Sequence, residues 1–322
     1  MKSYLNFTLT GDKLLPVWIA FFFFFMIPYY LLLGELTDLT ATDVPAEGPS
    51  RMFFLYLVII LTMVFSFIYI VFKLVTQNIE YEGVKLCCDY HPGIYTGIII
   101  SGLVLSIVTI GIYVPWFIKN LHRFFIGGSS YKSLKFSFRG KGGRLFLIMT
   151  LTTFIPFMLV GIILFSVLES RIDLESQNFL LIYQIIVMFC LVPNIYLIFK
   201  WMADIKYKHY HIRWDTEFFP ATGKIAIELV LAVITFGIYF PMAYIRLYTY
   251  FVEHTKSNVV EGRKISMGYD GDHFSDFLFM WGQILLTVVT LGFYYPWAFS
   301  RIAYRVISRT FLATDFSGIS GS

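Results

Sequence analysis

The chain has 322 residues, of which 57% are hydrophobic and 14% are charged, and its formal net charge is +4. A soluble domain carries about 25% charged residues, so this composition excludes an ordinary soluble protein and indicates a membrane protein. Cys87 and Cys88 are adjacent and Cys190 lies within an apolar run, which argues against a disulfide framework.

Seven apolar runs follow one another along the chain, and several exceed the roughly 18 residues that indicate a membrane-spanning helix. They are Leu14–Leu33, Met52–Val75, Ile94–Ile118, Leu145–Leu168, Phe179–Met202, Ile225–Tyr250 and Phe277–Phe299. The first run is too long for the core of a cleavable signal and lacks a small-residue cleavage site. We therefore interpret it as an anchor that stays in the protein.

Three of these runs contain the same eight-residue motif, in which Thr, Gly, Tyr and Pro keep their places. The copies are Thr109–Trp116, Thr235–Met242 and Thr290–Trp297. Gly weakens a helix, and Pro removes a backbone donor and clashes with the preceding turn. We therefore expect a break or bend of the backbone at each copy, carried by Thr109, Gly111, Pro115, Thr235, Gly237, Pro241, Thr290, Gly292 and Pro296.

A second repeated signal precedes the motif. The strand-like piece at Phe7–Gly11 recurs at Phe136–Gly140, 129 residues later, and Tyr239 follows Tyr113 by 126 residues. These similar offsets indicate an internal duplication of about 130 residues. We predict a first repeat over residues 1–135, a second over 136–264, and a partial third over 265–322 that holds the last motif and a basic tail.

The charges between the runs allow two topologies. Lys and Arg collect on the cytoplasmic side of membrane proteins, and the acidic loops Gly34–Ser50 and Glu169–Asn178 therefore indicate the outer side. The basic Lys119–Arg144 segment would also lie outside if the first motif run crossed the membrane. The conflict disappears if each motif run enters from the cytoplasm, breaks and returns. Three ordinary kinked crossings, with an inverted second half, are the alternative.

Polar groups recur at equivalent places around the motif. Seven residues before the motif Thr stand Gly102, Glu228 and Gln283. Ionisable groups inside a membrane are costly and often functional, so Glu228 and Gln283 are candidates for a polar pathway. The alternative is that Glu228 lies near the membrane surface and pairs with Lys224, four residues earlier on the same helix.

Two further sets are candidates for the same pathway. Five residues after the motif Pro stand Asn120, Arg246 and Arg301, which either ring a cytoplasmic opening or anchor the chain at lipid headgroups. The motif tyrosines either line a pore or anchor the interface, and they are Tyr113, Tyr239 and Tyr294.

Catalytic and metal-binding patterns are absent from the sequence. His209 with His211, Cys87 with His91, and Asp270 with Asp276 form polar clusters, but none has the spacing of a zinc site or an EF-hand. No protease, hydrolase or Walker motif is present. We therefore expect no enzyme activity, no metal, no cofactor and no nucleic-acid partner. The partner we expect is the lipid bilayer, with anionic headgroups at the basic cytoplasmic face.

The motif segments, each followed by a basic stretch, together with the strand-like lead-ins, resemble the YjgN-like family of bacterial inner-membrane proteins. That resemblance implies a bacterial cytoplasmic membrane but transfers no catalytic or binding residue, because the family's function is unknown. Met242 departs from the pattern, since Trp116 and Trp297 occupy the equivalent positions.

The sequence therefore predicts an all-α polytopic membrane protein, an internally duplicated helical bundle with Gly- and Pro-broken helices and short cytoplasmic β-like segments. We expect several passes and a cytoplasmic N-terminus. Two functions fit. The first is a passage protein for small molecules, ions or lipids, which predicts a polar cavity touching Glu228 and Gln283. The second is a non-transporting scaffold or envelope-associated protein, which predicts that those side chains are capped locally.

Overall fold

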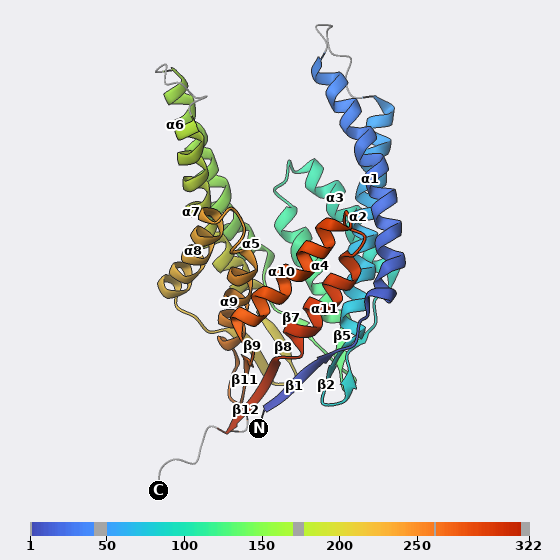
Figure 1. Ribbon diagram of the computed structural model, residues 1–322, viewed down its shortest axis with the longest axis vertical. Helices are drawn as coiled ribbons and strands as arrows, with labels where there is room; N and C mark the ends of the chain where they lie inside the picture. The colour runs from blue at the N-terminus through green and yellow to red at the C-terminus, as the bar shows by residue number, and fades with distance from the viewer. Residues whose placement is uncertain (1, 42–49, 170–176, 261, 317–322) are drawn as a thin grey trace. The chain divides into compact units, whose positions relative to one another are not determined.

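The computed structural model describes every residue except 1, 42–49, 170–176, 261 and 317–322 (Figure 1). Helices account for most of the described chain. They are α1 (Gly11–Ala41), α2 (Arg51–Gln77), α3 (Pro92–Val108), α4 (Val114–Gly128), α5 (Gly142–Met149), the π-helical turn η1 (Thr150–Phe154), α6 (Ile155–Glu169), α7 (Gln177–Met202), α8 (Phe218–Ile234), α9 (Phe240–Glu253), α10 (His273–Val289) and α11 (Tyr295–Ile307).

Short strands separate the helices. They are β1 (Lys2–Phe7), β2 (Ile79–Tyr81), β3 (Val84–Lys85), β4 (Cys87–Cys88), β5 (Ser129–Tyr131), β6 (Leu134–Lys135), β7 (Ser137–Phe138), β8 (Ile205–Tyr207), β9 (Tyr210–Trp214), β10 (Thr255–Ser257), β11 (Arg263–Tyr269) and β12 (Thr310–Phe316).

The chain forms two compact units. One contains residues 1–4, 89–277 and 309–322, and the other contains residues 5–88 and 278–308. Within the first unit, the start of β1 pairs with β12, and antiparallel pairing continues through β11, β10, β9 and β8 to β7. Within the second unit, the end of β1 pairs with β2, and β2 pairs with β3.

These pairings correct the predicted all-α class. Nine of the described strands are joined in the order β3-β2-β1-β12-β11-β10-β9-β8-β7, and β5 pairs with β6 in a second, smaller sheet. The sequence prediction treated the strand-like pieces as isolated segments. It missed the sheet because most strands have two to five residues and because β1 pairs with a strand some 300 residues away, as at Lys2 and Ala313.

The helices form hairpins, and each hairpin begins and ends next to the strands. In five places the N–H before the first helix of a hairpin donates to a carbonyl oxygen after its last helix. These bonds are Thr8 to Asn78 at 2.9 Å, Asp89 to Gly128 at 2.8 Å, Arg139 to Asp204 at 3.0 Å, Asp215 to His254 at 2.8 Å and Asp270 to Arg309 at 2.9 Å. The chain is thus an alternation of strands and helical hairpins, and both ends of each hairpin lie side by side.

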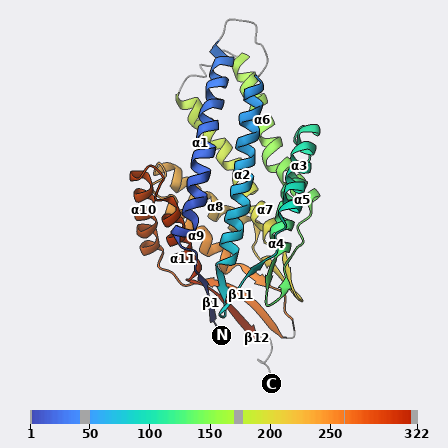
Figure 2. The same ribbon diagram turned by 90° about the vertical axis from the view of Figure 1, so that its right-hand side faces the viewer.

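Two of the hairpins are long. In one, α1 and α2 lie side by side along their length (Figure 2), and the other contains α5, η1, α6 and α7. Among the described residues, three helical segments are long and apolar enough to cross a membrane, namely Gly11–Thr37, Arg51–Gln77 and Gly142–Ile162. The π-helical turn in the second long hairpin is held by Asn194 of α7, whose amide donates to the hydroxyls of Thr152 and Thr153 at 2.8 Å each.

The other three hairpins contain the motif and are called the motif hairpins below. They are α3–α4, α8–α9 and α10–α11, and the motif forms the turn between the two helices of each. Figure 1 shows α3 rising to this turn and α4 descending from it. The predicted return of each motif run is confirmed as a fold-back of the chain, whereas its place in a membrane stays a prediction. The predicted division into repeats also stays a prediction.

The motif tryptophans pack against the first glycines of the long hairpins. A Cβ atom added to Gly142 would lie 2.6 Å from the Trp116 ring, and one added to Gly11 would lie 2.5 Å from the Trp297 ring. The Trp297 indole also donates to Asp12 at 3.1 Å. The second motif copy has Met242 at the position of these tryptophans.

This packing predicts opposite effects at two adjacent glycines. Gly142→Ala should lower the free energy of unfolding by about 1–3 kcal/mol, because the methyl group overlaps the Trp116 ring. Gly143→Ala should be neutral or stabilise by up to about 1 kcal/mol, because nothing lies within 4 Å of its added Cβ and Ala favours a helix. Thermal unfolding of the detergent-purified variants measures both. Equal effects at the two positions would contradict the packing.

Candidate functional site

The motif turn is the same in all three copies. The residue before the motif Gly has a φ of 50° in each copy, at Ile110, Phe236 and Leu291. The glycines that follow have φ values of 84°, 84° and 89°. Two successive residues with positive φ reverse the chain direction. The second of them is the motif Gly, which adopts this conformation without steric cost because it has no Cβ atom. The motif glycines thus have a backbone conformation that residues with a side chain rarely adopt.

The turn satisfies its own backbone donors. In the first copy each N–H from Thr109 to Val114 has an acceptor within the hairpin, and the distances lie between 2.7 and 3.1 Å. The Thr109 hydroxyl accepts from the Tyr113 N–H at 3.0 Å and donates to the Leu105 carbonyl at 2.7 Å. Pro115 has no N–H to satisfy. The second and third copies repeat this pattern.

The apex side chain of each turn is apolar and exposed. Beside the third turn, Trp18 of α1 donates to the Gly292 carbonyl at 3.0 Å. Ile110 is 92% exposed, Phe236 is 96% exposed and Leu291 is 81% exposed. The flanking residues Val108, Ile234 and Val289 are each more than 60% exposed. An isolated apolar side chain on a surface is ordinary, but a cluster of them at the end of a hairpin is not. The tips therefore need an apolar environment outside the chain.

Below the tip, the second motif hairpin contains a closed polar set around Glu228, which is fully buried. The Tyr239 hydroxyl donates to Glu228 Oε2 at 2.9 Å and accepts from Arg246 at 2.8 Å. The Lys224 ammonium lies 2.8 Å from Glu228 Oε1. We call Glu228, Tyr239 and Arg246 the clasp, because they join the two helices of the hairpin.

The third motif hairpin has the same clasp with an amide in place of the carboxylate. The Tyr294 hydroxyl donates to Gln283 at 3.1 Å and accepts from Arg301 at 2.7 Å. In the first hairpin Asn120 donates to the Tyr113 hydroxyl at 3.4 Å. There the third partner is lost, since a Cβ at Gly102 would lie 2.1 Å from the ring of Phe117.

The structure thus brings the predicted polar residues together within each hairpin. Glu228 pairs with Lys224, as the alternative interpretation of the sequence expected, and also with residues of the following helix. Sequence reasoning placed the glutamate, tyrosine and arginine positions in separate sets because they lie 11 and 7 residues apart. It did not relate Asp89, Asp215 and Asp270 at the hairpin feet to one another, although their offsets of 126 and 55 residues equal those of the motif threonines.

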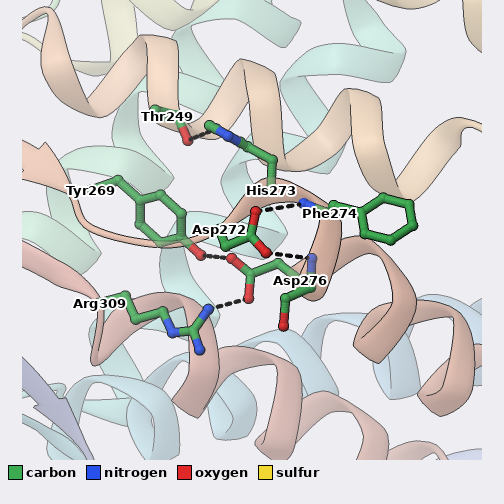
Figure 3. A network of polar contacts seen from close by, with 8 residues as sticks. Thr249, Tyr269, Asp272, His273, Phe274, Asp276 and Arg309 are labelled. Carbon is green, nitrogen blue, oxygen red and sulfur yellow. Dashed lines mark hydrogen bonds and ion pairs between the residues drawn. The ribbon is translucent and has the colours of Figure 1, made fainter.

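The foot of the third motif hairpin contains a second polar network (Figure 3). Asp276 is buried, and it accepts from the Tyr269 hydroxyl at 2.5 Å and from the Arg309 guanidinium. Two causes raise the pKa of Tyr269. The larger is its burial, and the second is this hydrogen bond to Asp276. Asp272 caps α10 by accepting from two backbone N–H groups of its first turn. The network fixes both ends of the hairpin to β11.

Among the cavities lined by described residues, one lies at the foot of the first motif hairpin and is lined by residues that include Asn120 and Arg123. Another is lined by residues that include Phe199 and Phe251, whose rings stack on each other. Neither of these two is lined by Glu228 or Gln283. Within the described part of the chain, no group of three His, Cys, Asp or Glu side chains is placed to hold a metal ion.

Comparison with known proteins gives a family but no activity. The family described as "Bacterial protein of unknown function (DUF898)" matches residues 2–120 and 104–264. This chain belongs to that family. The resemblance to YjgN-like proteins is thereby confirmed. The first matched range contains the first motif copy, and the second range contains the first and second copies. No curated protein and no solved structure matches the chain.

The clasp predicts a coupled effect of two substitutions. Glu228→Gln reproduces the polar set of the third hairpin, so the protein should fold, but Lys224 and Arg246 lose their buried anion. We expect the free energy of unfolding of Glu228→Gln to be about 2 kcal/mol lower than that of the wild type. Breaking a buried pair costs about 3–5 kcal/mol, and the loss is smaller here because the Lys224 and Arg246 side chains are 36% and 44% exposed.

Lys224→Gln combined with Glu228→Gln should recover part of that loss, because the uncompensated cation is removed. Unfolding of the single and double variants in detergent gives the coupling free energy between the two positions. Additive effects of the two substitutions would show that Glu228 does not depend on Lys224.

Proposed function

We propose that this protein is an integral protein of the bacterial cytoplasmic membrane and acts as a non-transporting membrane scaffold. In this proposal the strands lie on the cytoplasmic face, the two long hairpins cross the bilayer, and the three motif hairpins enter from the cytoplasm and return. The observation that carries it is the motif turn, whose backbone donors are satisfied internally while its apolar tip is exposed.

A hydrocarbon environment around the turn explains both the internal pairing of its backbone donors and the exposure of its apolar tip. Water is absent from the bilayer core, so an unpaired backbone N–H there costs several kcal/mol. Non-helical backbone at that depth is tolerated where it has its own partners or lies in protein. The turn after Thr109 supplies a partner for every donor up to Val114, and the exposed Ile110 then gains from contact with lipid tails.

The lengths of the motif helices fit re-entry. The helices α3, α8 and α10 each have 17 residues, which is about 25 Å of helix. This is less than the roughly 30 Å of the hydrocarbon core. Lys224 lies six residues from the start of α8, or about 9 Å. Glu228 lies ten residues from the same start, or about 15 Å, so the clasp lies deeper than Lys224, and the exposed Lys224 and Arg246 side chains extend from it toward the headgroups.

The charge distribution supports the cytoplasmic side for the strands. Among the Lys and Arg residues that the structure describes, only Arg51 falls at the far end of a long hairpin, whereas the strands and strand-proximal halves of the motif hairpins contain most of the others. A surplus of Lys and Arg marks the cytoplasmic side. The N-terminus, which starts β1, lies on that side in this proposal.

The clasp favours a scaffold over a passage protein. A pathway through the motif hairpins requires Glu228 and Gln283 to face a polar route. Both side chains are instead bonded within their own hairpins. Local capping is what the scaffold hypothesis expects from the sequence.

The depth of the tip tests the proposal directly. A spin label is attached at Phe236→Cys, with Cys87, Cys88 and Cys190 replaced by Ser, and the protein is reconstituted in lipid bilayers. We expect frequent collisions with oxygen and few with a water-soluble nickel chelate, because the tip lies in hydrocarbon. Lys208→Cys, in the exposed turn between β8 and β9, is the control and should give the opposite ratio. A tip label accessible to the nickel chelate would contradict re-entry.

Transport is tested separately. Liposomes containing the protein should show no protein-dependent flux of potassium ions, protons or fluorescent phospholipid above that of empty liposomes. A flux that is present in the wild type and lost in Glu228→Gln would overturn the scaffold proposal and favour passage.

A further inference from the structure

The cavity at the foot of the first motif hairpin has a volume of 440 Å³. Polar side chains line one part of it and apolar side chains line the other. The lining residues used below are Asp89, His91, Ile94, Ile98, Arg123 and Lys135. They come from the start of α3, from α4 and from β6, which the hairpin closure between Asp89 and Gly128 holds together.

The polar part is cationic. Lys135 Nζ lies 3.3 Å from Asp89 Oδ2, and His91 Nε2 lies 3.4 Å from Asp89 Oδ1. One carboxylate thus holds the lysine and the histidine next to each other. Arg123 has no hydrogen-bond or ion-pair partner within the described part of the chain. Its guanidinium adds a second full positive charge to the wall, against a single carboxylate.

Comparison of the three motif hairpins shows that this arginine is specific to the first. In the second and third hairpins the arginine of the clasp, Arg246 or Arg301, bonds to the motif tyrosine. In the first hairpin Asn120 has that place and itself lines the cavity. The arginine stands three residues further on, at Arg123, about one turn along α4. The first hairpin therefore has its arginine in the cavity wall rather than bonded to the motif tyrosine.

The apolar part of the cavity continues along the membrane-facing helix. Ile94 and Ile98 line it, and Leu105 lies on the same face of α3 because these positions are spaced by four and seven residues. Ile94 is 58% exposed and Leu105 is 39% exposed. A ligand that fits therefore needs an anionic group at one end and an apolar chain at the other.

We infer that this cavity binds the phosphate group of an anionic phospholipid, with the headgroup phosphate at Arg123, Lys135 and His91 and an acyl chain along Ile94 and Ile98. Guanidinium and ammonium groups form charge-assisted hydrogen bonds with phosphate oxygens. The inference rests on the proposed scaffold role only in placing the hairpin foot at the headgroup level. Free inorganic phosphate shares the headgroup chemistry but lacks the chain.

Native mass spectrometry of the delipidated full-length protein in detergent tests the site, with phosphatidylglycerol as the probe. Arg123→Gln should weaken binding about tenfold, the effect of one lost charge-assisted hydrogen bond. Gly127→Leu should weaken binding without changing the charge. Gly127 lines the cavity and nothing lies within 4 Å of its added Cβ, so this variant should fold. Lys208→Gln is the matched control, with the same charge change at a residue that does not line the cavity, and should bind as the wild type does.

Three outcomes would overturn the inference. One is wild-type affinity in both Arg123→Gln and Gly127→Leu, and another is an equal loss in Lys208→Gln. The third is equally tight binding of inorganic phosphate, with displacement of the lipid, which would make this a free-phosphate site. Binding in detergent does not depend on the depth of the motif tips, so this result stands apart from the spin-label result.

Discussion

The hydrogen bonds that close the motif turn are the constraint on which the rest of the structure depends. A hairpin can end in hydrocarbon only if its turn leaves no backbone donor unpaired. Thr109 supplies a side-chain acceptor at the point where the helical pattern fails, Gly111 adopts the positive φ that the reversal needs, and Pro115 removes a donor. The motif tyrosine is the fourth fixed residue of the eight. In the second and third copies its hydroxyl ties the two helices together below the turn, through Glu228 or Gln283.

The three hairpins share the turn but differ in the polar group that lies between their two helices. The second buries a carboxylate between two cations, the third uses a neutral amide, and the first replaces the group with Gly102 and fills the space with Phe117. Because the polar set is not constant, the hairpins share a shape rather than a common chemistry. The first hairpin has the fewest polar contacts in its clasp, and it is also the one with a cavity at its foot.

The motif hairpins can be predicted from the sequence more readily than the sheet can. Recurrence of Thr, Gly, Tyr and Pro is visible without any structure, and basic segments on both sides of each motif predict its return. The clasp is harder to see, because Glu228 and Tyr239 are eleven residues apart and meet only across the turn. The sheet is hidden for another reason. Strands such as β3 and β7 have two residues each, and the partner of Lys2 is Ala313. Neither periodicity nor local spacing records such a pairing.

Hydrogen exchange of the protein in lipid nanodiscs tests the central claim most directly. Amides of residues 109–114 and 235–240 are internally bonded and, in this account, shielded by lipid. They should therefore exchange as slowly as the helices α3 and α8 that precede them, and far more slowly than the turn at Lys208. Exchange in the motif turns as fast as at Lys208 would show that these turns open to water, and would contradict the account.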